Sequence, residues 1–228
     1  MTNPIIRRRH LVRLGVGSSV AAIGWKAHAQ TPPDVKVALL APISGPWARQ
    51  GLQMQAGAEM AVDEINASGG MKALGGAKMK LLVFDAGDSA ETAKNAAQRM
   101  VAQEPDLVGG TGAWLSSFTL AVTEVTERAG LPWLTLSYSN VITDRGFHNV
   151  FQTALIATEQ SARALPVALE LGRSAGVTVT RMGILTDNTA SSVSFLKPIR
   201  GTELQKRNIK LVMDETYTPP LSDATSLV

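Results

Sequence analysis

The sequence contains no cysteine, which excludes several kinds of crosslink and site at once. A chain without cysteine forms no disulfide, even in an oxidising compartment, and carries no lipid on an N-terminal cysteine. Histidine is scarce too, since His10 and His28 lie in the first 29 residues and only His148 lies beyond them. A lone histidine, which we expect in a loop, is not the ligand set of a transition metal. We therefore expect no metal and no cofactor.

The motifs of common enzyme classes are also missing. No G-x-S-x-G turn of a hydrolase occurs. The stretch GGTGAW, 109–114, fails as a dinucleotide-binding loop because Leu115 stands where the last glycine belongs, and GGMKALGGAK, 69–78, lacks the Gly-Lys-Ser/Thr ending of a phosphate-binding loop. No paired carboxylates fall in a predicted loop with the burial pattern of an acid/base couple. We expect no enzyme, and a flavodoxin-like or hydrolase enzyme is kept as the third alternative.

Long apolar runs are absent, so the sequence predicts no membrane-spanning helix. The formal net charge of +3 comes from the start of the chain. The first 29 residues hold five basic residues and no acidic one: Arg7, Arg8, Arg9, Arg13 and Lys26. Removing these five from the 22 Lys and Arg leaves 17 against 19 acidic residues, a net charge of −2. The net positive charge of the full sequence therefore gives no support to a nucleic-acid partner.

Residues 1–29 have the pattern of a signal peptide. RRRHLVR, 7–13, is a charged region, LGVGSSVAAIG, 14–24, is mildly apolar, and AHA, 27–29, fits a small-x-small cleavage site. The paired arginines and Lys26 favour a twin-arginine signal, with an ordinary secretory signal as the alternative. We expect an exported, periplasmic protein cleaved near Ala29.

After a short linker, apolar runs that favour strands alternate with segments of helical apolar spacing. In 53–66, Met54, Ala58, Val62 and Ile65 fall on one helix face, and Asp88 with Glu91 in the next helix has capping-box spacing. The predicted strands are 35–40, 79–84, 106–109, 133–136, 150–152, 181–186 and 209–213. The predicted helices are 53–66, 88–103, 118–129, 159–171 and a weaker 193–207, followed by a loop-like tail.

This alternation predicts an α/β fold of doubly wound parallel sheets, because each right-handed crossover returns the chain over a face of the sheet. In such sheets, ligands bind beyond the carboxyl ends of the strands. The loops that carry candidate binding residues are therefore 41–52, 85–88, 110–117, 137–145 and 187–192.

Hydroxyl side chains gather in two of these loops. Ser116 and Ser117 stand at the start of a predicted helix, where free N–H groups and the helix dipole favour a carboxylate, although serine also caps helices without any ligand. Ser137, Tyr138 and Ser139 follow a buried strand, where hydroxyls bind an ammonium or a carboxylate, or simply form a turn. Asp187 ends another strand and either pairs with a ligand ammonium or caps the next helix.

Four stretches, in this order, resemble the periplasmic solute-binding proteins of the leucine/isoleucine/valine-binding type. They are APISGPWARQG (41–51), GAEMAVDEINASGG (57–70), LLVFDAGDSAETAKNAAQRMV (81–101) and GLPWLTLSYSN with TDRGFHNVFQT (130–140 and 143–153). The resemblance covers essentially all of 35–228. It implies a type I periplasmic-binding-protein clamshell, in which two lobes close on a small molecule and deliver it to an ABC permease in the inner membrane.

The resemblance also implies which residues form the site. The family's carboxylate-binding serine matches Ser116, with Ser117 beside it, and its second ligand loop matches 137–139. The aromatic residue after Ser-Gly-Pro matches Trp47, which would wall the pocket; a surface-packed tryptophan is the alternative. Trp114 and Tyr138 are bulkier than the residues common in the family at these positions. The implied ligand is thus a branched-chain or other amino acid, an amide or an aromatic acid.

Two departures from the family pattern shape the remaining expectations. The turn DNTASS, 187–192, lacks the family's aromatic residue and glycine, which leaves the far side of the ligand open. The chain is also short, so we expect a C-terminally truncated clamshell: an incomplete first lobe, 30–155, and the start of a second, 156–228. Such a fragment would expose a sheet edge and bind weakly by itself. The alternative function is a ligand-sensing domain of a signalling system with the same fold.

Overall fold

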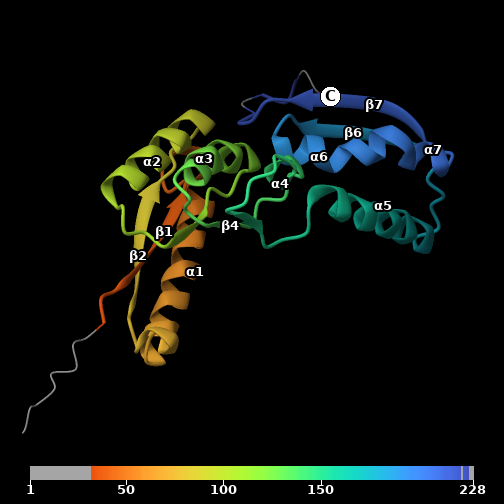
Figure 1. Ribbon diagram of the computed structural model, residues 1–228. Helices are drawn as coiled ribbons and strands as arrows, with labels where there is room; N and C mark the ends of the chain where they lie inside the picture. Colours follow the sequence, from red (N-terminus) through yellow and green to blue (C-terminus); the bar gives the residue numbers. More distant parts are fainter. Residues whose placement is uncertain (1–31, 222, 226–228) are drawn as a thin grey trace, which may run out of the picture. The chain divides into compact units, whose positions relative to one another are not determined.

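The computed structural model describes residues 32–221 and 223–225, which belong to one unit spanning Pro32–Val228 (Figure 1). The expected signal peptide, 1–29, lies outside the described residues. The first sheet has the strand order β2-β1-β3-β4-β5, and the second pairs β6 with β7. Every pair is parallel, which confirms the expected α/β class with doubly wound parallel sheets.

The elements follow the predicted alternation. The strands are β1 (Val35–Ala41), β2 (Met79–Asp85), β3 (Gly109–Gly112), β4 (Trp133–Thr135), β5 (Val150–Gln152), β6 (Arg181–Asp187) and β7 (Lys210–Tyr217). The α-helices are α1 (Ala48–Ala67), α2 (Ala90–Gln103), α3 (Ser116–Arg128), α4 (Val141–Asp144), α5 (Ala157–Ser174), α6 (Ala190–Pro198) and α7 (Leu204–Lys206). Two 3-10 turns, η1 (Gly45–Trp47) and η2 (Lys72–Leu74), and a π-helical segment, η3 (Ile199–Glu203), complete the set.

Two local predictions were wrong. The strand expected at 106–109 begins only at Gly109, because its residues are mostly glycines that give no apolar pattern. The capping box of α2 is formed by Ser89 and Thr92 rather than by Asp88 and Glu91. The Ser89 hydroxyl accepts from the Thr92 N–H at 3.1 Å, while the Thr92 hydroxyl accepts from the Ser89 N–H at 3.0 Å.

The core of the first sheet lies under α2 and α3, which run side by side in Figure 1. Ala38 and Leu40 of β1 point into it, together with Trp133 of β4, which is fully buried. Gly110 of β3 lies under the Trp133 ring, where an added Cβ would come within 2.4 Å of a ring carbon. The glycine-rich strand therefore makes room for a large aromatic side chain in the core.

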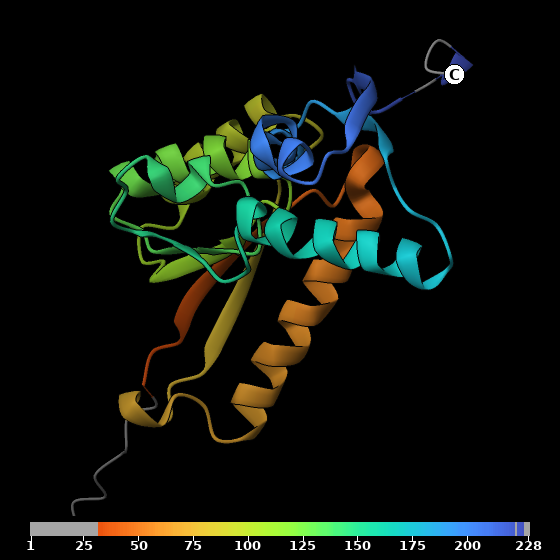
Figure 2. The same cartoon turned by 90° about the vertical axis from the view of Figure 1, so that its right-hand side faces the viewer.

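The opposite face of this sheet carries α1, which runs along β1 and β2 (Figure 2). Met54, Ala58, Val62 and Ile65 share a half-buried face of α1, as their spacing predicts. Beyond α1 an apolar hollow of about 550 Å³ lies over β3 and β4. Its side chains include Val108, Leu134 and Leu136, which are 55%, 46% and 62% exposed. We call this hollow the β3–β4 groove.

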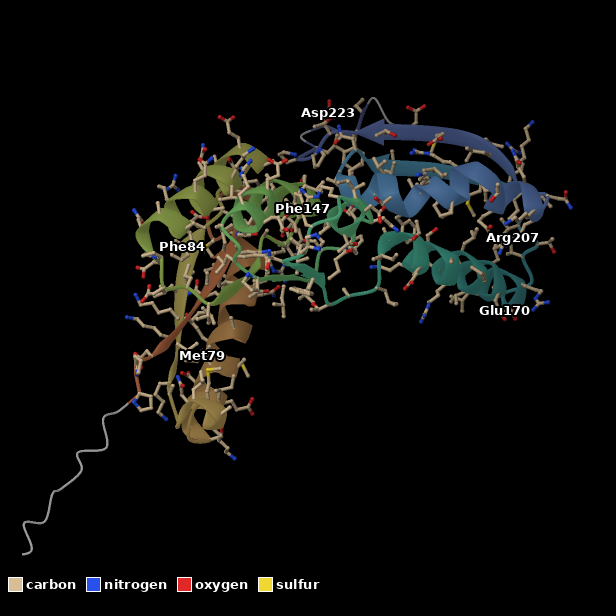
Figure 3. All side chains as sticks on the ribbon, in the orientation of Figure 1. Met79, Phe84, Phe147, Glu170, Arg207 and Asp223 are labelled. Atoms are coloured by element: carbon tan, nitrogen blue, oxygen red, sulfur yellow. The ribbon has the colours of Figure 1, made fainter. Side chains whose placement is uncertain are left out.

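The second sheet packs its own small core against α5, α6 and η3. The buried residues are Leu165, Ile184, Leu196, Ile199, Leu204 and Ile209. Arg200 forms an ion pair with Asp214 of β7 across this unit. Glu170 is exposed on α5 and Arg207 is half-buried after α7, whereas Met79 begins β2 in the first sheet and Phe84 is its last residue but one (Figure 3).

Candidate functional site

A cavity of about 240 Å³ lies at the carboxyl ends of β3, β6 and β7, where loop residues from both sheets meet. This volume is slightly below the roughly 300 Å³ at which typical ligand pockets begin, so it suits a small molecule. The cavity is lined by Trp47, Trp114, Leu115, Ser116, Tyr138, Asp187, Thr189, Ser191, Ser192, Tyr217 and Pro219. Hereafter it is called the strand-end cavity.

Two tryptophans form one wall of the strand-end cavity. The ring centroids of Trp47 and Trp114 lie 5.2 Å apart with an interplanar angle of 51°. Both residues are half-buried. Trp47 is the last residue of η1 and directly precedes α1, so the strand-to-helix turn after β1 delivers it to the cavity.

The loop that carries Trp47 is held by Asp85 at the end of β2. The Asp85 carboxylate accepts hydrogen bonds from the N–H of Ile43 at 3.1 Å and of Gly87 at 2.9 Å. Partial burial acts to raise the pKa of Asp85, but hydrogen bonds from Ser44, Gly87 and Ile43 outweigh it and lower that pKa below its ordinary value. The ionised carboxylate therefore ties the β1–α1 loop to the next strand.

Trp114 reaches the cavity through a left-handed turn. Gly112, Ala113 and Trp114 have φ angles of 119°, 67° and 52°, and two of the three are not glycine. At Gly112 an added Cβ would come within 2.2 Å of the Leu40 carbonyl oxygen, so only glycine fits there. The Ala113 N–H donates to that carbonyl at 2.5 Å.

Ser116 and Ser117 differ in their surroundings. Helix α3 begins at Ser116, two residues earlier than predicted, with Leu115 at the N-cap position and no side-chain cap. The Ser116 hydroxyl is buried, lines the cavity and accepts from the Ser139 N–H at 3.2 Å. Ser117 is half-buried and is not among the lining residues. The capping alternative therefore does not describe Ser116.

The second hydroxyl loop alternates between interior and cavity. Ser137 and Ser139 are buried, whereas Tyr138 between them is 37% exposed and lines the cavity. The Ser137 hydroxyl donates to the Trp114 carbonyl at 2.7 Å, and the Ser139 hydroxyl bonds the Ser194 hydroxyl at 2.9 Å. Because successive residues of an extended segment face opposite sides, only Tyr138 of the three is placed on the cavity wall.

Asp187, the last residue of β6, faces the cavity and also braces the turn before α6. Its carboxylate accepts from the Thr189 N–H at 2.8 Å and from the Thr189 hydroxyl at 2.5 Å. Partial burial acts to raise its pKa, but hydrogen bonds from Thr189 and Ser192 outweigh that effect and lower the pKa. Asp187 is therefore ionised at neutral pH. The capping alternative is wrong, because Thr189 is the N-cap residue of α6, no side chain caps this helix, and Asp187 accepts from Thr189 instead. The same carboxylate offers further acceptor positions.

Sequence reasoning missed most of the second wall. The lining residues that it did not single out are Leu115, Thr189, Ser191, Ser192, Tyr217 and Pro219. Tyr217 was placed in the loop-like tail, yet β7 continues to it and sets it beside Asp187 in the sheet register. The last four residues of β7, DETY (214–217), show no alternation of apolar and polar residues. Their acidic side chains are typical of a loop, so nothing in the sequence indicated that the strand continues. The DNTASS turn held a usable signal, namely three hydroxyl residues after a strand end.

The charge of the strand-end cavity is simple. Among its described lining residues, Asp187 is the one ionised side chain, and none is Lys, Arg or His. In the described part of the chain, no group of three or more His, Cys, Asp or Glu residues is placed to hold a metal ion. None of the described helices has both the length and the apolar character to cross a membrane.

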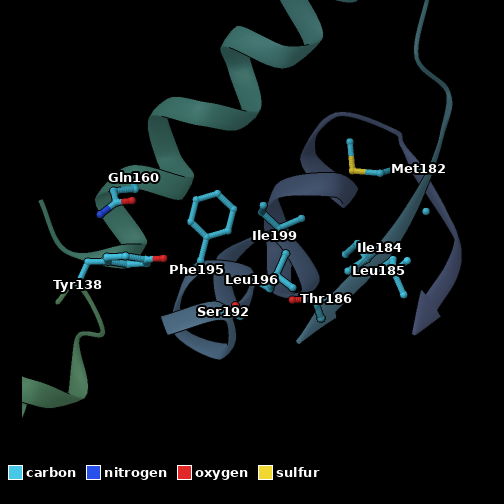
Figure 4. Close-up of a pocket in the computed structure, with 11 residues that line it drawn as sticks. Tyr138, Gln160, Met182, Ile184, Leu185, Thr186, Ser192, Phe195, Leu196 and Ile199 are labelled. Atoms are coloured by element: carbon cyan, nitrogen blue, oxygen red, sulfur yellow. The ribbon is translucent and has the colours of Figure 1, made fainter. Parts of the chain in front are cut away.

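A second cavity, of about 460 Å³, adjoins the first. It runs along β6 from Met182 to Thr186, and Tyr138 and Ser192 line both cavities. In Figure 4 the Phe195 ring of α6 lies between Gln160 and Ile199 on its wall. Within the described residues β6 pairs only with β7, so this cavity lies at the unpaired edge of β6.

Comparison with known proteins identifies the family to which the chain belongs. Residues 34–228 match the model of the family described as "Periplasmic binding protein". The Leu/Ile/Val-binding protein homolog 7 of Brucella melitensis is 30% identical over 226 residues, which cover 96% of this chain and 53% of that protein. Homolog 8 of Brucella suis is 36% identical over 148 residues, covering 63% and 35% of the two chains. The chain thus spans about half the length of the curated relatives it matches.

Two solved structures share the fold. The branched-chain amino acid transporter substrate-binding protein LivJ of Streptococcus pneumoniae, in complex with isoleucine, aligns with a TM-score of 0.69 at 24% identity, covering 85% of this chain and 52% of that one. An ABC-transporter solute-binding protein of Rhodopseudomonas palustris, in complex with 3,4-dihydroxybenzoic acid, aligns with a TM-score of 0.71 at 16% identity, covering 85% and 50%. The parallel sheets, the site at the strand ends and the family match lead to one conclusion: this chain belongs to the periplasmic binding protein family, as a type I member of the Leu/Ile/Val-binding type.

Proposed function

We propose that this chain captures a small zwitterionic solute, of the amino-acid class, for an ABC importer. The observation that carries the proposal is the strand-end cavity itself. It brings together one ionised carboxylate, Asp187, a buried neutral hydroxyl, Ser116, and an aromatic wall. Such a set binds a small polar molecule through hydrogen bonds and through burial of its apolar part.

Asp187 is the proposed partner of the ligand's ammonium group. Its carboxylate is ionised, lines the cavity and has no cationic side chain among the described lining residues to neutralise it. An ammonium group supplies the missing positive charge and several N–H donors. A charged hydrogen bond of this type contributes about 1.5–3 kcal/mol.

Ser116 is the proposed partner of the ligand's carboxylate. Its hydroxyl accepts from the Ser139 N–H, so its own proton is free to donate to a ligand oxygen. It also stands in the first turn of α3, whose free N–H groups and dipole favour negative charge. Ser117, Ser137 and Ser139, expected beside it, are proposed to support this wall without facing the ligand.

The aromatic side chains select the rest of the ligand. Trp47, Trp114, Tyr138 and Tyr217 contribute ring surface to the cavity. Rings of this kind bury an apolar or planar side chain and contact a nearby cation with their faces. We therefore propose an amino acid with a bulky apolar or aromatic side chain. A free aromatic monoanion is disfavoured, because it would meet Asp187 without a compensating cation.

The importer role and the export route rest on the family and on the expected leader. The two lobes that enclose the ligand are proposed as 30–155 and 156–228, and export as cleavage near Ala29. Structural neighbours include a branched-chain amino acid transporter protein bound to isoleucine and an ABC-transporter protein bound to a dihydroxybenzoic acid. An ABC permease in the inner membrane is the proposed partner. Permease and ATPase genes beside the coding gene would distinguish transport from a sensing role.

Thermal-shift titration of the chain tests the ligand class. L-isoleucine and L-phenylalanine are expected to raise the unfolding midpoint with increasing concentration, because they bind the folded state alone. The decarboxylated amine and the deaminated acid of each are the matched controls and are expected to act more weakly. A larger shift with 4-hydroxybenzoate than with any amino acid would contradict the proposal.

A further inference from the structure

We propose that Thr119 and Ser137 are positioning residues that hold the left-handed turn Gly112–Trp114 and so fix the Trp114 indole on the cavity wall. The role assigned to Ser137 differs from the direct ligand contact expected from the sequence. The structural part stands on the geometry of this chain. Only its consequence for ligand affinity rests on the proposed function.

The turn needs external support because its backbone is strained. Ala113 and Trp114 both have positive φ angles, which are unfavourable for residues other than glycine. A large β-carbon substituent such as the indole of Trp114 does not favour this conformation by itself. The surrounding structure must therefore hold the turn in place.

A chain of two buried hydroxyls supplies that support. Thr119 and Ser137 are 0% and 1% exposed, and their oxygens lie 2.7 Å apart. The Ser137 hydroxyl is also 2.7 Å from the Trp114 carbonyl, and the Thr119 hydroxyl is 3.1 Å from the Leu115 carbonyl. Each hydroxyl has one proton to donate. Because Ser137 donates to Trp114, we assign the Thr119 proton to Ser137 at 2.7 Å and not to the Leu115 carbonyl at 3.1 Å, which already accepts from the Thr119 N–H at 2.9 Å. The relay then runs from α3 to the turn.

This relay acts on the two residues that precede α3. Both the Trp114 and the Leu115 carbonyl lie within reach of it, and both residues line the strand-end cavity. Removing either hydroxyl would leave the partly buried Trp114 carbonyl with a weakened or missing donor. The strained turn then relaxes toward ordinary φ angles and carries the indole away from Trp47.

Two other buried hydroxyls provide matched controls. Thr126 is on the same helix as Thr119 and is also 0% exposed, and Ser161 is 1% exposed like Ser137. Within the described residues, the hydroxyl oxygens of Thr126 and Ser161 have no hydrogen-bond partner. Thr126→Val and Ser161→Ala therefore remove a buried hydroxyl without touching the relay.

The experiment compares near-ultraviolet circular dichroism and L-isoleucine affinity in the full chain. Trp114→Phe first identifies the band that the Trp47–Trp114 pair produces. Thr119→Val and Ser137→Ala are expected to lose this band, with unchanged far-ultraviolet spectra, and to bind L-isoleucine about tenfold more weakly. Thr119→Ser, Thr126→Val and Ser161→Ala are expected to keep both. If Ser137→Ala fails to fold, Ser137→Cys takes its place, since it keeps the volume and weakens the hydrogen bond.

The outcomes separate this inference from the proposed function. A wild-type chain that shows the paired-tryptophan band but binds no amino acid refutes the proposed function and leaves the positioning role testable by the band alone. Retention of the band in folded Thr119→Val and in the folded Ser137 variant overturns the positioning role. So would equal loss of the band in Thr126→Val or Ser161→Ala, because the effect would then not be specific to the relay.

Discussion

The ring centroids of Trp47 and Trp114 lie 5.2 Å apart, although the two residues come from the loops after different strands, β1 and β3. Their tilted arrangement is one that aromatic pairs favour, and it contributes about 0.5–1.5 kcal/mol beyond burial of area. We predict a coupling energy of that size in a double-mutant cycle of Trp47→Leu and Trp114→Leu, measured by urea unfolding. Additive effects of the two substitutions would show that the rings do not interact in solution.

Ser116→Ala is predicted to weaken binding of L-isoleucine by about 1–3 kcal/mol, because the ligand carboxylate would lose a buried hydroxyl donor. Isothermal titration calorimetry measures the change. Ser117→Ala is the matched control, since Ser117 is adjacent but does not line the cavity. Equal losses in the two variants would show that the carboxylate is not bound by Ser116 in particular.

Asp187→Asn is predicted to weaken L-isoleucine binding by about 1.5–3 kcal/mol, because it removes the charge that faces the ammonium group. The pKa of Asp187 is lowered in the folded chain, so wild-type affinity should hold as pH falls from neutral to the ordinary aspartate value of about 3.9. Asp88→Asn, an exposed carboxylate after β2, serves as the control. A loss of wild-type affinity centred near pH 6 would point to a different titrating group.

Asp85 is predicted to contribute to stability only above acidic pH. Because its pKa is lower in the folded than in the unfolded chain, its contribution is present above the unfolded value of about 3.9. That contribution is lost as pH falls further through the folded value. Asp85→Asn should therefore reduce the free energy of unfolding at pH 7 and have little effect at the acid end. Urea unfolding at several pH values checks this, and an equal effect at every pH would contradict it.

Two glycines of α1 are predicted to respond oppositely to alanine. At Gly51 an added Cβ would come within 2.0 Å of the Pro42 carbonyl oxygen, whereas at Gly57 nothing lies within 4 Å. Gly57→Ala should stabilise the chain by up to about 1 kcal/mol, because alanine favours a helix. Gly51→Ala should destabilise it and shift the loop that carries Trp47. Thermal unfolding of both variants distinguishes them, and a stabilising Gly51→Ala would contradict the close approach.

The fold class was predictable from the sequence because the hydrophobic patterns of its strands and helices are strong and local. Apolar strand runs and helical spacing identified nearly every element of the first sheet, including β5 at its observed bounds. Strand β3 was misplaced because glycine gives no hydrophobic periodicity. Glycine is required at position 110 because a side chain there would collide with the ring of Trp133, a residue of another strand. Contacts of that kind are set by packing and not by the local pattern.

The candidate site was predictable to the level of loops, but not in every case to the side chain that lines the cavity. Composition pointed to 137–139, yet the choice between the two faces of this extended segment depends on which side the core occupies. The core takes Ser137 and Ser139, and the cavity takes Tyr138. Similarly, Tyr217 joins the site through its register with Asp187, and strand register is not readable from a tail of mixed composition.

The sparse charge of the strand-end cavity has a kinetic consequence. With one carboxylate and otherwise neutral groups among its described lining residues, the cavity projects little field into solution. A zwitterion, which has no net charge, is then captured by unassisted diffusion. Its association rate should change little between dilute buffer and high salt, in contrast to sites that attract charged partners from a distance. Such a protein would collect its solute equally well across wide swings of external salinity.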